Sequence, residues 1–230
     1  MIRYLLTIFP IATSFFTPVV LTICLIAIIY TSLACLSQID LKKYIAYSSI
    51  AHMGTATLGL FSNTVIGIVG GLFFLISHGL IAGALFLLIG VLYDRYHTRN
   101  ITYYRGLVSI MPIFVTLYLF FSMANAAIPG TSGFISEFLT LTGTFQSNPL
   151  VAIIACLAIV LTPAYSLWFF HKVSYGSFSP YLPTIFPDLT KKEFNMFMPL
   201  IFFTLLLGLN SSFLTEYILL TSMSLSAIGQ

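Results

Sequence analysis

The sequence predicts an all-α integral membrane protein in which six helices cross the bilayer and the fourth is broken near its middle. Hydrophobic residues make up 59% of the 230 positions and charged residues only 7%, whereas about one-quarter of an ordinary soluble domain is charged. A soluble protein of this size needs a polar surface, so lipid must cover most of this chain. The apolar residues also come in runs of about 20, the length that crosses a bilayer core roughly 30 Å thick.

Short polar connections divide the apolar residues into six runs, which we expect to form a single transmembrane domain over residues 1–230. The main connections are Ser37–Lys43, Tyr93–Arg105 and His171–Glu193. The predicted spans lie near Thr17–Leu36, Tyr44–Phe61, Val65–Leu92, Met111–Phe145, Leu150–Phe170 and Phe194–Leu214.

The basic residues gather on one side of this predicted topology. With six crossings, the connections after the first, third and fifth spans share one face of the membrane. Those connections hold Lys42, Lys43, Arg95, Arg99, Arg105, Lys172, Lys191 and Lys192, and only Arg3 remains for the opposite face. Lysine and arginine collect on the cytoplasmic side, or on the matrix side in a mitochondrion. The pattern therefore predicts that both termini lie on the other side.

The fourth run, Met111–Phe145, is too long for one straight span. Its 35 residues would make a helix about 52 Å long at a rise of 1.5 Å per residue. In its middle, Pro129 removes a backbone donor, Gly130 adds flexibility, and Thr131 and Ser132 can cap a new helix. We therefore predict a break at Pro129–Gly133. Transporters place such breaks at ion sites, because non-helical backbone in a membrane must lie within protein or beside water.

Glu137 follows this break and is the first candidate for a functional group. Its neighbours are apolar, and no lysine, arginine or histidine lies within thirty positions on either side. A carboxylate at the centre of a bilayer costs roughly 2.5–3.5 kcal/mol on insertion scales. We therefore expect Glu137 to face a polar interior and to titrate abnormally. The alternative is an acid close to the membrane surface.

Two histidines in the second and third predicted spans are further candidates. Ser48 and Ser49 precede His52 by four and three residues, so the three side chains share one helical face, and Ser77 directly precedes His78. A neutral histidine can pass a proton between water molecules at low cost. Each imidazole could instead simply hydrogen-bond a neighbouring helix, but two histidines and one acid in a small bundle favour a proton relay.

Two interpretations remain open for each of three supporting residues. Asn125 and Thr131 could hold water around the break, or they could bond helices together. Lys42, at the start of the second span, could exchange protons at the membrane surface, or it could be a snorkelling anchor that only fixes the topology.

Several classes of function are not indicated. The three cysteines lie in apolar runs without metal-binding spacing, so no metal site is predicted. The chain has no GxGxxG motif, Walker loop, HExxH motif or cysteine cluster for an iron–sulfur centre. We therefore expect no cofactor and no redox chemistry in this chain. Nucleic acid is also not an expected partner, because the charges are few and follow membrane topology.

Five stretches of the chain carry a resemblance to a known family. They are Gln38–Met53, Ser77–Leu80, Leu92–Arg99, Pro129–Phe138 and Ala164–Trp168. Together they resemble the antiporter-like, proton-pumping subunits of respiratory complex I, the NADH:ubiquinone oxidoreductase, and within that family the subunit 4 group in its mitochondrial form. The resemblance covers nearly the whole chain.

The resemblance implies roles for the three ionisable residues. Glu137 corresponds to the terminal proton-exchange glutamate of the family's second half-channel, and His52 and His78 correspond to the buried hydrated chain that leads to it. The chain would then be one subunit of a proton-translocating enzyme of the mitochondrial inner membrane, with both termini towards the intermembrane space. The NADH, ubiquinone, FMN and iron–sulfur clusters of that enzyme would be bound by other subunits.

The resemblance also implies partners. Full members of the family consist of two inverted halves, and this chain resembles only the second half. It lacks the two membrane lysines that the family uses in the first half and at the junction. We therefore expect a separate chain to supply the N-terminal half of subunit 4, with neighbouring antiporter-like subunits and lipids as further partners. A truncated fragment would be the other explanation.

Two other functions remain open at this stage. The chain could be a subunit of a multi-subunit cation/proton antiporter, which shares the fold and similar motifs but contains no oxidoreductase. It could also be a structural fragment that pumps no protons.

Overall fold

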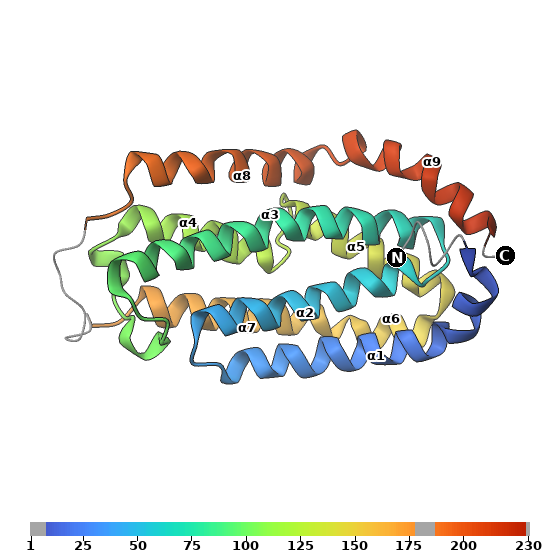
Figure 1. Ribbon diagram of the computed structural model, residues 1–230, viewed down its shortest axis with the longest axis horizontal. Helices are drawn as coiled ribbons and strands as arrows, with labels where there is room; N and C mark the ends of the chain where they lie inside the picture. Colours follow the sequence, from blue (N-terminus) through green and yellow to red (C-terminus); the bar gives the residue numbers. More distant parts are fainter. Residues whose placement is uncertain (1–7, 178–186, 229–230) are drawn as a thin grey trace.

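The computed structural model describes residues 8–177 and 187–228, with side chains up to Met223. The described residues form a bundle of α-helices that run roughly along the long axis of the molecule (Figure 1). The helices are α1 (Pro10–Ser37), α2 (Leu41–Leu60), α3 (Val65–Tyr96), α4 (Pro112–Asn125), α5 (Ser132–Ser147), α6 (Pro149–Ala155), α7 (Leu157–Ser174), α8 (Lys191–Leu209) and α9 (Ser212–Ile228). Two short 3-10 turns, Ile101–Tyr103 and Leu107–Ser109, lie between α3 and α4.

Helices occupy all six predicted segments, and the expectation of an all-α membrane fold is confirmed. Among the described residues, α1, α3, the α6–α7 stretch and α8 are long and apolar enough to cross a membrane, and α4 is shorter but also apolar. By contrast, α2 is rich in serine, threonine, glycine and histidine, and most of its residues are buried. It packs against α1, α3 and α5, so it is an interior helix of the bundle.

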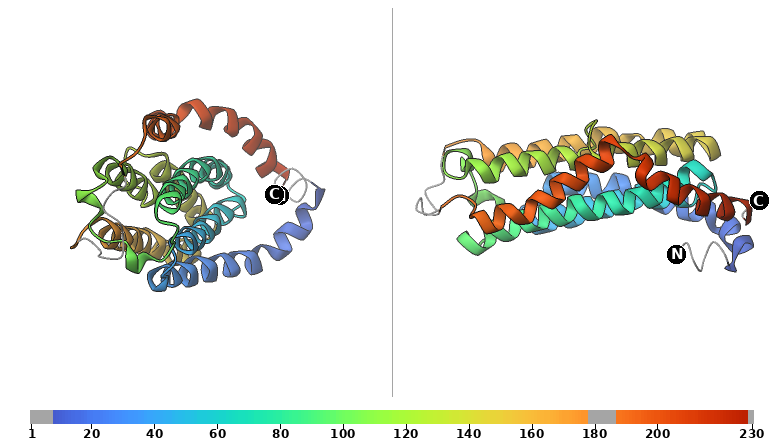
Figure 2. Two further views of the ribbon diagram at one scale, coloured as in Figure 1. Left: turned by 60° about the vertical axis from the view of Figure 1, so that its left-hand side comes forward. Right: turned by 90° about the horizontal axis from the view of Figure 1, so that it is seen from above.

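The outer helices expose apolar side chains, as expected for contact with lipid or with other membrane chains. Figure 2 shows that α1 and the α8–α9 pair lie on opposite sides of the bundle. The large exposed side chains of α1 include Ile11, Phe15, Val19, Ile23 and Ile26.

The last helix was not predicted. The sixth span was expected to continue to Leu214, but α8 ends at Leu209 and α9 begins at Ser212. At the junction, the Ser212 hydroxyl donates a hydrogen bond to Asn210 Oδ1 over 2.6 Å. The new helix packs along α3. Composition alone did not separate the two helices, because residues on both sides of the junction are apolar.

The fourth predicted span is broken, as expected, and α4 and α5 are its two halves. The break covers residues 126–131, slightly before the predicted Pro129–Gly133, because Gly133 already lies inside α5. Ala127 and Gly130 both have positive φ angles, 54° and 95°, which turns the chain out of the helical path. The expected cap is absent, since the Thr131 hydroxyl donates to the carbonyl of Ile128 and accepts no hydrogen bond from an amide at the start of α5.

Two glycines allow close backbone contacts at the break, one from α8 and one between α5 and α4. A Cβ atom on Gly208 of α8 would lie 2.7 Å from the carbonyl carbon of Gly130, and one on Gly133 would lie 2.7 Å from the carbonyl oxygen of Ala124. Real Cβ atoms essentially never approach so closely. The backbone of α8 therefore rests directly on the non-helical segment.

The connections that follow α1, α3 and α7 meet at one end of the molecule, as the expected topology requires. The amide of Leu41 donates to the Arg99 carbonyl over 3.0 Å, and the amide of Gly106 donates to the Tyr175 carbonyl over 3.2 Å. This basic end contains all eight of the lysines and arginines assigned to it, whereas Arg3 lies outside the described residues.

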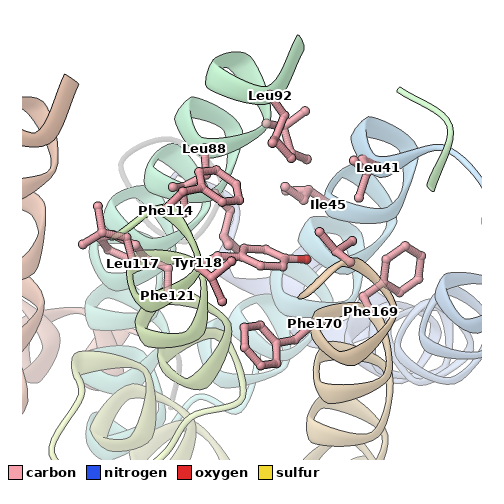
Figure 3. Close-up of a cluster of buried hydrophobic side chains, with 14 of the residues drawn as sticks. Leu41, Ile45, Leu88, Leu92, Phe114, Leu117, Tyr118, Phe121, Phe169 and Phe170 are labelled. Carbon is pink, nitrogen blue, oxygen red and sulfur yellow. The ribbon is translucent and has the colours of Figure 1, made fainter. Parts of the chain in front are cut away.

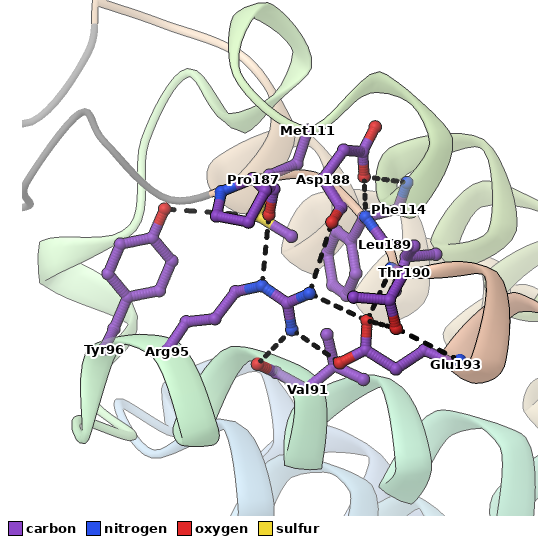
Figure 4. A network of polar contacts seen from close by, with 10 residues as sticks. All are labelled: Val91, Arg95, Tyr96, Met111, Phe114, Pro187, Asp188, Leu189, Thr190 and Glu193. Carbon is purple, nitrogen blue, oxygen red and sulfur yellow. Dashed lines mark hydrogen bonds and ion pairs between the residues drawn. The ribbon is translucent and has the colours of Figure 1, made fainter.

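Arg95, near the C-terminal end of α3, ties this basic end together (Figure 4). Its guanidinium donates to both carboxylate oxygens of Glu193, over 3.0 and 2.8 Å. It also donates to the backbone carbonyls of Pro187 and Asp188. The Asp188 carboxylate in turn accepts the amide of Ile113 over 2.7 Å, at the start of α4. These contacts hold the N-terminal ends of α4 and α8 against α3.

An apolar layer separates this basic end from the middle of the bundle (Figure 3). It consists of side chains from α2, α3, α4 and α7. Its labelled members in Figure 3 are Leu41, Ile45, Leu88, Leu92, Phe114, Leu117, Tyr118, Phe121, Phe169 and Phe170. These labelled side chains are all buried, so the layer shields the polar residues deeper in the bundle from bulk water.

Candidate functional site

The two predicted histidines meet inside the bundle. Their rings come from neighbouring helices, His52 from α2 and His78 from α3, and the ring centroids are 5.3 Å apart. His52 is only 6% exposed, and its ring also lies 5.7 Å from that of Phe74. The pair therefore sits in the packed interior of the bundle with one apolar wall.

A small cavity joins the histidine pair to the two ends of the broken helix. Its empty volume is about 240 Å³, which includes the gaps between atoms and its open mouth. The lining residues are His52, Phe74, Ser77, His78, Ile81, Ala124, Asn125, Ala127, Gly133 and Glu137. The break thus brings the end of α4 and the start of α5 to the same space as both imidazoles.

Glu137 lies between this cavity and a second one. It is 5% exposed, and its carboxylate makes no hydrogen bond or ion pair with any residue that the structure describes. It also lines a second cavity of about 380 Å³ empty volume, together with Phe134, Phe138 and Ile159 among others. A carboxyl group in this position can exchange a proton with either space.

Ser77 and Asn125 complete the polar lining. The Ser77 hydroxyl donates to the Ser132 hydroxyl over 2.8 Å, which joins α3 to the first residue of α5. Asn125 is the last residue of α4, and it lines the same cavity as His52. Both residues therefore belong to the site that the sequence predicted around the break.

Other predicted supporting residues lie outside this cavity. The hydroxyls of Ser48 and Ser49 both donate to the carbonyl of Ile45, over 2.8 and 3.0 Å, so they bond their own helix. Lys42 is exposed in the first turn of α2, ten residues before His52, or about 15 Å along the helix axis.

The remaining three predicted residues, Pro129, Gly130 and Thr131, belong to the break between α4 and α5. None of them lines the cavity.

Some residues of the site were not predicted from the sequence. Phe74 and Ile81 form the apolar wall of the cavity, and nothing distinguishes them from other residues of an apolar helix. Tyr165 of α7 is fully buried, and its hydroxyl has no hydrogen-bond partner among the residues that the structure describes. The only signal for it was its position in the stretch Ala164–Trp168.

The arrangement is suited to the binding and transfer of protons. Two imidazoles and one carboxyl group border a space too small for a large substrate, and no lysine or arginine lines it. Within the described residues, no three histidine, cysteine or acidic side chains are grouped to hold a metal ion. Imidazole and carboxyl groups can each accept and release one proton, and buried examples in membrane proteins commonly mark proton relays.

Comparison with known proteins gives a consistent result. Residues 1–162 match the family described as NADH:quinone oxidoreductase/Mrp antiporter, transmembrane. NADH-ubiquinone oxidoreductase chain 4 of Marchantia polymorpha is 52% identical over 87% of this chain and 40% of its own length. NADH-quinone oxidoreductase subunit M of Rhodobacter capsulatus is 46% identical over 94% of this chain and 42% of its own length. The chain thus spans about two-fifths of the length of these relatives.

Solved structures show the same fold. A chain of respiratory complex I from Thermus thermophilus with bound NADH matches 95% of this chain and 46% of its own length, with a TM-score of 0.87 and 31% identity. A chain of the Mrp complex from Dietzia sp. DQ12-45-1b matches 93% of this chain and 48% of its own length, with a TM-score of 0.82. At 19% identity, the second match shows the fold alone. This chain therefore belongs to the transmembrane family of NADH:quinone oxidoreductase and Mrp antiporter subunits.

Proposed function

We propose that this chain conducts protons across the mitochondrial inner membrane as the C-terminal part of subunit 4 of respiratory complex I. The observation that carries the proposal is the position of Glu137, which is buried, has no fixed partner among the described residues, and borders both the histidine cavity and the second cavity. The relatives that are about half identical to the chain are named as chain 4 of NADH-ubiquinone oxidoreductase.

In this proposal, a proton moves from the histidine pair to Glu137 and then into the second cavity. The imidazoles of His52 and His78 are 5.3 Å apart, so a proton on one ring raises the free energy of protonating the other. The pair therefore holds one proton more readily than two. The arrival of a second proton favours transfer of the first to Glu137, and coupling between neighbouring sites is electrostatic.

The energy for pumping would come from elsewhere in the complex. Electron transfer from NADH to ubiquinone through FMN and iron–sulfur clusters would take place in other subunits, and this chain would be a subunit of the translocase without its own redox centre. The basic end would face the matrix, because lysine and arginine collect there, and both termini would face the intermembrane space.

The chain would also need partners to complete the subunit. Its relatives are more than twice as long, so we propose that the N-terminal half of the subunit packs against the part described here. The exposed apolar side chains of α1 would face that half, neighbouring antiporter-like subunits or lipid.

The second candidate is a cation/proton antiporter subunit, which the description of the matched family as NADH:quinone oxidoreductase/Mrp antiporter favours. Sodium-dependent proton exchange without NADH would support this candidate. A purely structural role is the third possibility, and it predicts that the ionisable residues can be replaced without loss of activity.

Replacement of Glu137 by glutamine tests the proposal against both alternatives. Glutamine keeps the size of the side chain but cannot bind and release a proton. We expect at least a roughly tenfold fall in proton pumping and in coupled NADH oxidation by the assembled complex, because a positioned proton-transfer group typically contributes about 10²–10⁴-fold. The assay is proton uptake by vesicles that contain the purified complex.

Glu216→Gln is the matched control, because Glu216 is exposed on α9 and undergoes the same chemical change. Normal rates in both variants, with normal amounts of complex, would reject proton conduction and leave the structural role. Sodium-dependent exchange that is lost only in Glu137→Gln would favour the antiporter.

A further inference from the structure

The hydrogen bond between Ser77 and Ser132 is unusual for a buried serine of this bundle. A serine hydroxyl in a helix easily reaches a carbonyl three or four residues earlier in its own helix. Ser136 of α5, for example, donates to the carbonyl of Gly133 over 2.7 Å. The Ser77 hydroxyl instead crosses from α3 to α5 and donates to the Ser132 hydroxyl over 2.8 Å. Because Ser77 is 1% and Ser132 0% exposed, bulk water does not compete for this bond.

The C-terminal half of α5 is held against α3 in a different way. There the Thr64 hydroxyl, just before α3, donates to the Gly143 carbonyl over 3.0 Å. The two helices also touch backbone to backbone, since a Cβ atom on Gly70 would lie 2.5 Å from the amide nitrogen of Thr140. The helices therefore run antiparallel, and close packing fixes this half of α5.

The start of α5 has one polar link to its neighbours. It follows the break, where Ala127 and Gly130 have positive φ angles, and no side chain caps it. Within the described part of the chain, the bond between Ser77 and Ser132 is the one side-chain hydrogen bond that joins residues 126–137 to another helix. Glu137 thus lies between the closely packed half of α5 and this single bond.

The bond also joins the two helices whose ionisable groups border the histidine cavity. Ser77 directly precedes His78 on α3, and it lines the cavity together with His78 and Glu137. Ser132 precedes Glu137 by five residues on α5. Proton transfer needs two groups within hydrogen-bond reach, directly or through one water, and a misplacement of about 1 Å can slow a reaction on the order of 100-fold. The distance between α3 and α5 is therefore important for transfer.

We propose that Ser77 and Ser132 are positioning residues of the proton path, whose hydrogen bond holds the first turn of α5 against α3 and so keeps Glu137 at the edge of the histidine cavity. This proposal rests on the proposed function. Neither serine gains or loses a proton, and both act through Glu137. If Ser132 loses its hydroxyl, the Ser77 hydroxyl can turn to a carbonyl of its own helix. The link is then lost without leaving a buried donor unpaired.

Ser132→Ala tests this role, because alanine removes only the hydroxyl. We expect normal amounts of assembled complex and a several-fold fall in proton pumping and coupled NADH oxidation. Ser77→Ala removes the other partner of the bond and should give a similar fall. Ser136→Ala is the matched control. Ser136 lies on the same helix, is also 0% exposed and directly precedes Glu137, but its hydroxyl bonds its own helix, so this variant should pump at the normal rate.

Two further measurements separate positioning from general packing. If the two serines act through one bond, the double variant Ser77→Ala with Ser132→Ala should be no slower than the slower single variant, since the same link is lost twice. The C=O band of a protonated carboxyl group depends on its surroundings. The infrared band of Glu137 should therefore change position in Ser77→Ala and in Ser132→Ala and keep its position in Ser136→Ala.

Equal rates in Ser132→Ala and Ser136→Ala would overturn the proposal, as would strictly additive effects in the double variant or an unshifted Glu137 band. Poor assembly of both Ser77→Ala and Ser132→Ala would also overturn it, because the bond would then hold the fold and not the position of Glu137. If Glu137→Gln is slow while Ser132→Ala is normal, the proposed function stands and only the positioning role is rejected. If neither variant is slow, both fail.

Discussion

Three ionisable side chains without fixed partners among the described residues would provide the chemistry of the proposed site. His52 faces His78 across 5.3 Å, and Glu137 makes no ion pair with a described residue. The one ion pair within the described residues, between Arg95 and Glu193, lies at the basic end. A permanent salt bridge would hold a group in one protonation state, whereas a group that faces only neutral neighbours can change state when a nearby charge changes.

Replacement of His52 or His78 by glutamine should slow proton pumping, because an amide cannot carry the proton that an imidazole accepts. We expect a several-fold fall in the rate of proton uptake by vesicles that contain the purified complex. His171→Gln serves as the control, since His171 is exposed at the basic end. Equal rates in all three variants would contradict a role for the histidine pair.

The key ionisable residues could be found from the sequence because such residues are rare within apolar runs. Other details depend on the orientation of side chains in the folded protein, which the sequence does not contain. Ser48 and Ser49 share a helical face with His52, but their hydroxyls bond the carbonyl of Ile45, since a serine in a helix easily reaches that carbonyl. Tyr165 in an apolar run looks like ordinary aromatic packing, and only its unpartnered hydroxyl distinguishes it.

At the scale of elements, the broken helix brings the site together. Its length and its proline and glycines were enough to predict the break, but not which neighbour would cover it. The structure places α8 on the break at Gly208, and it adds α9 beyond Asn210. Both features depend on packing between distant segments, which residues along one helix do not reveal.

Gly208→Ala should destabilise the bundle by forcing α8 away from the break. The added Cβ atom would lie 2.7 Å from the carbonyl carbon of Gly130, and overpacking of this kind costs about 1–3 kcal/mol. We expect a lower thermal unfolding midpoint and less assembled complex. Gly79→Ala is the control, because a Cβ atom there meets nothing within 4 Å. A Gly208→Ala protein as stable as that control would show that α8 does not rest on the break.

The ion pair at the basic end predicts a pH dependence of stability. Its hydrogen bonds from Arg95 lower the pKa of Glu193 to about 2, from an ordinary value of 4.5. The stabilisation is therefore complete above about pH 4.5 and is lost as the pH falls towards 2. Glu193→Gln should lower the thermal unfolding midpoint at pH 7, and the difference from the unaltered protein should narrow below pH 4.5. A constant difference across this range would contradict the assignment.

At the scale of the whole molecule, the apolar layer separates the basic end from the polar residues around the histidine pair and Glu137. The basic end holds the lysines, the arginines and the Arg95 network (Figure 4), which fix the ends of α3, α4 and α8. The cavity that the histidines and Glu137 border lies farther from the basic end along α2, α3 and α4 than the layer residues labelled in Figure 3. A proton path needs this separation, because water continuous with the basic end would let protons leak without coupling.

The central claim is that Glu137 gains and loses a proton while the complex works. Infrared difference spectroscopy of the purified complex during NADH oxidation tests it most directly, because a protonated carboxyl group has its own C=O band. The account predicts a carboxyl band that changes during turnover, that is lost in Glu137→Gln and that is kept in Glu216→Gln. An identical difference spectrum in Glu137→Gln and the unaltered complex would contradict it.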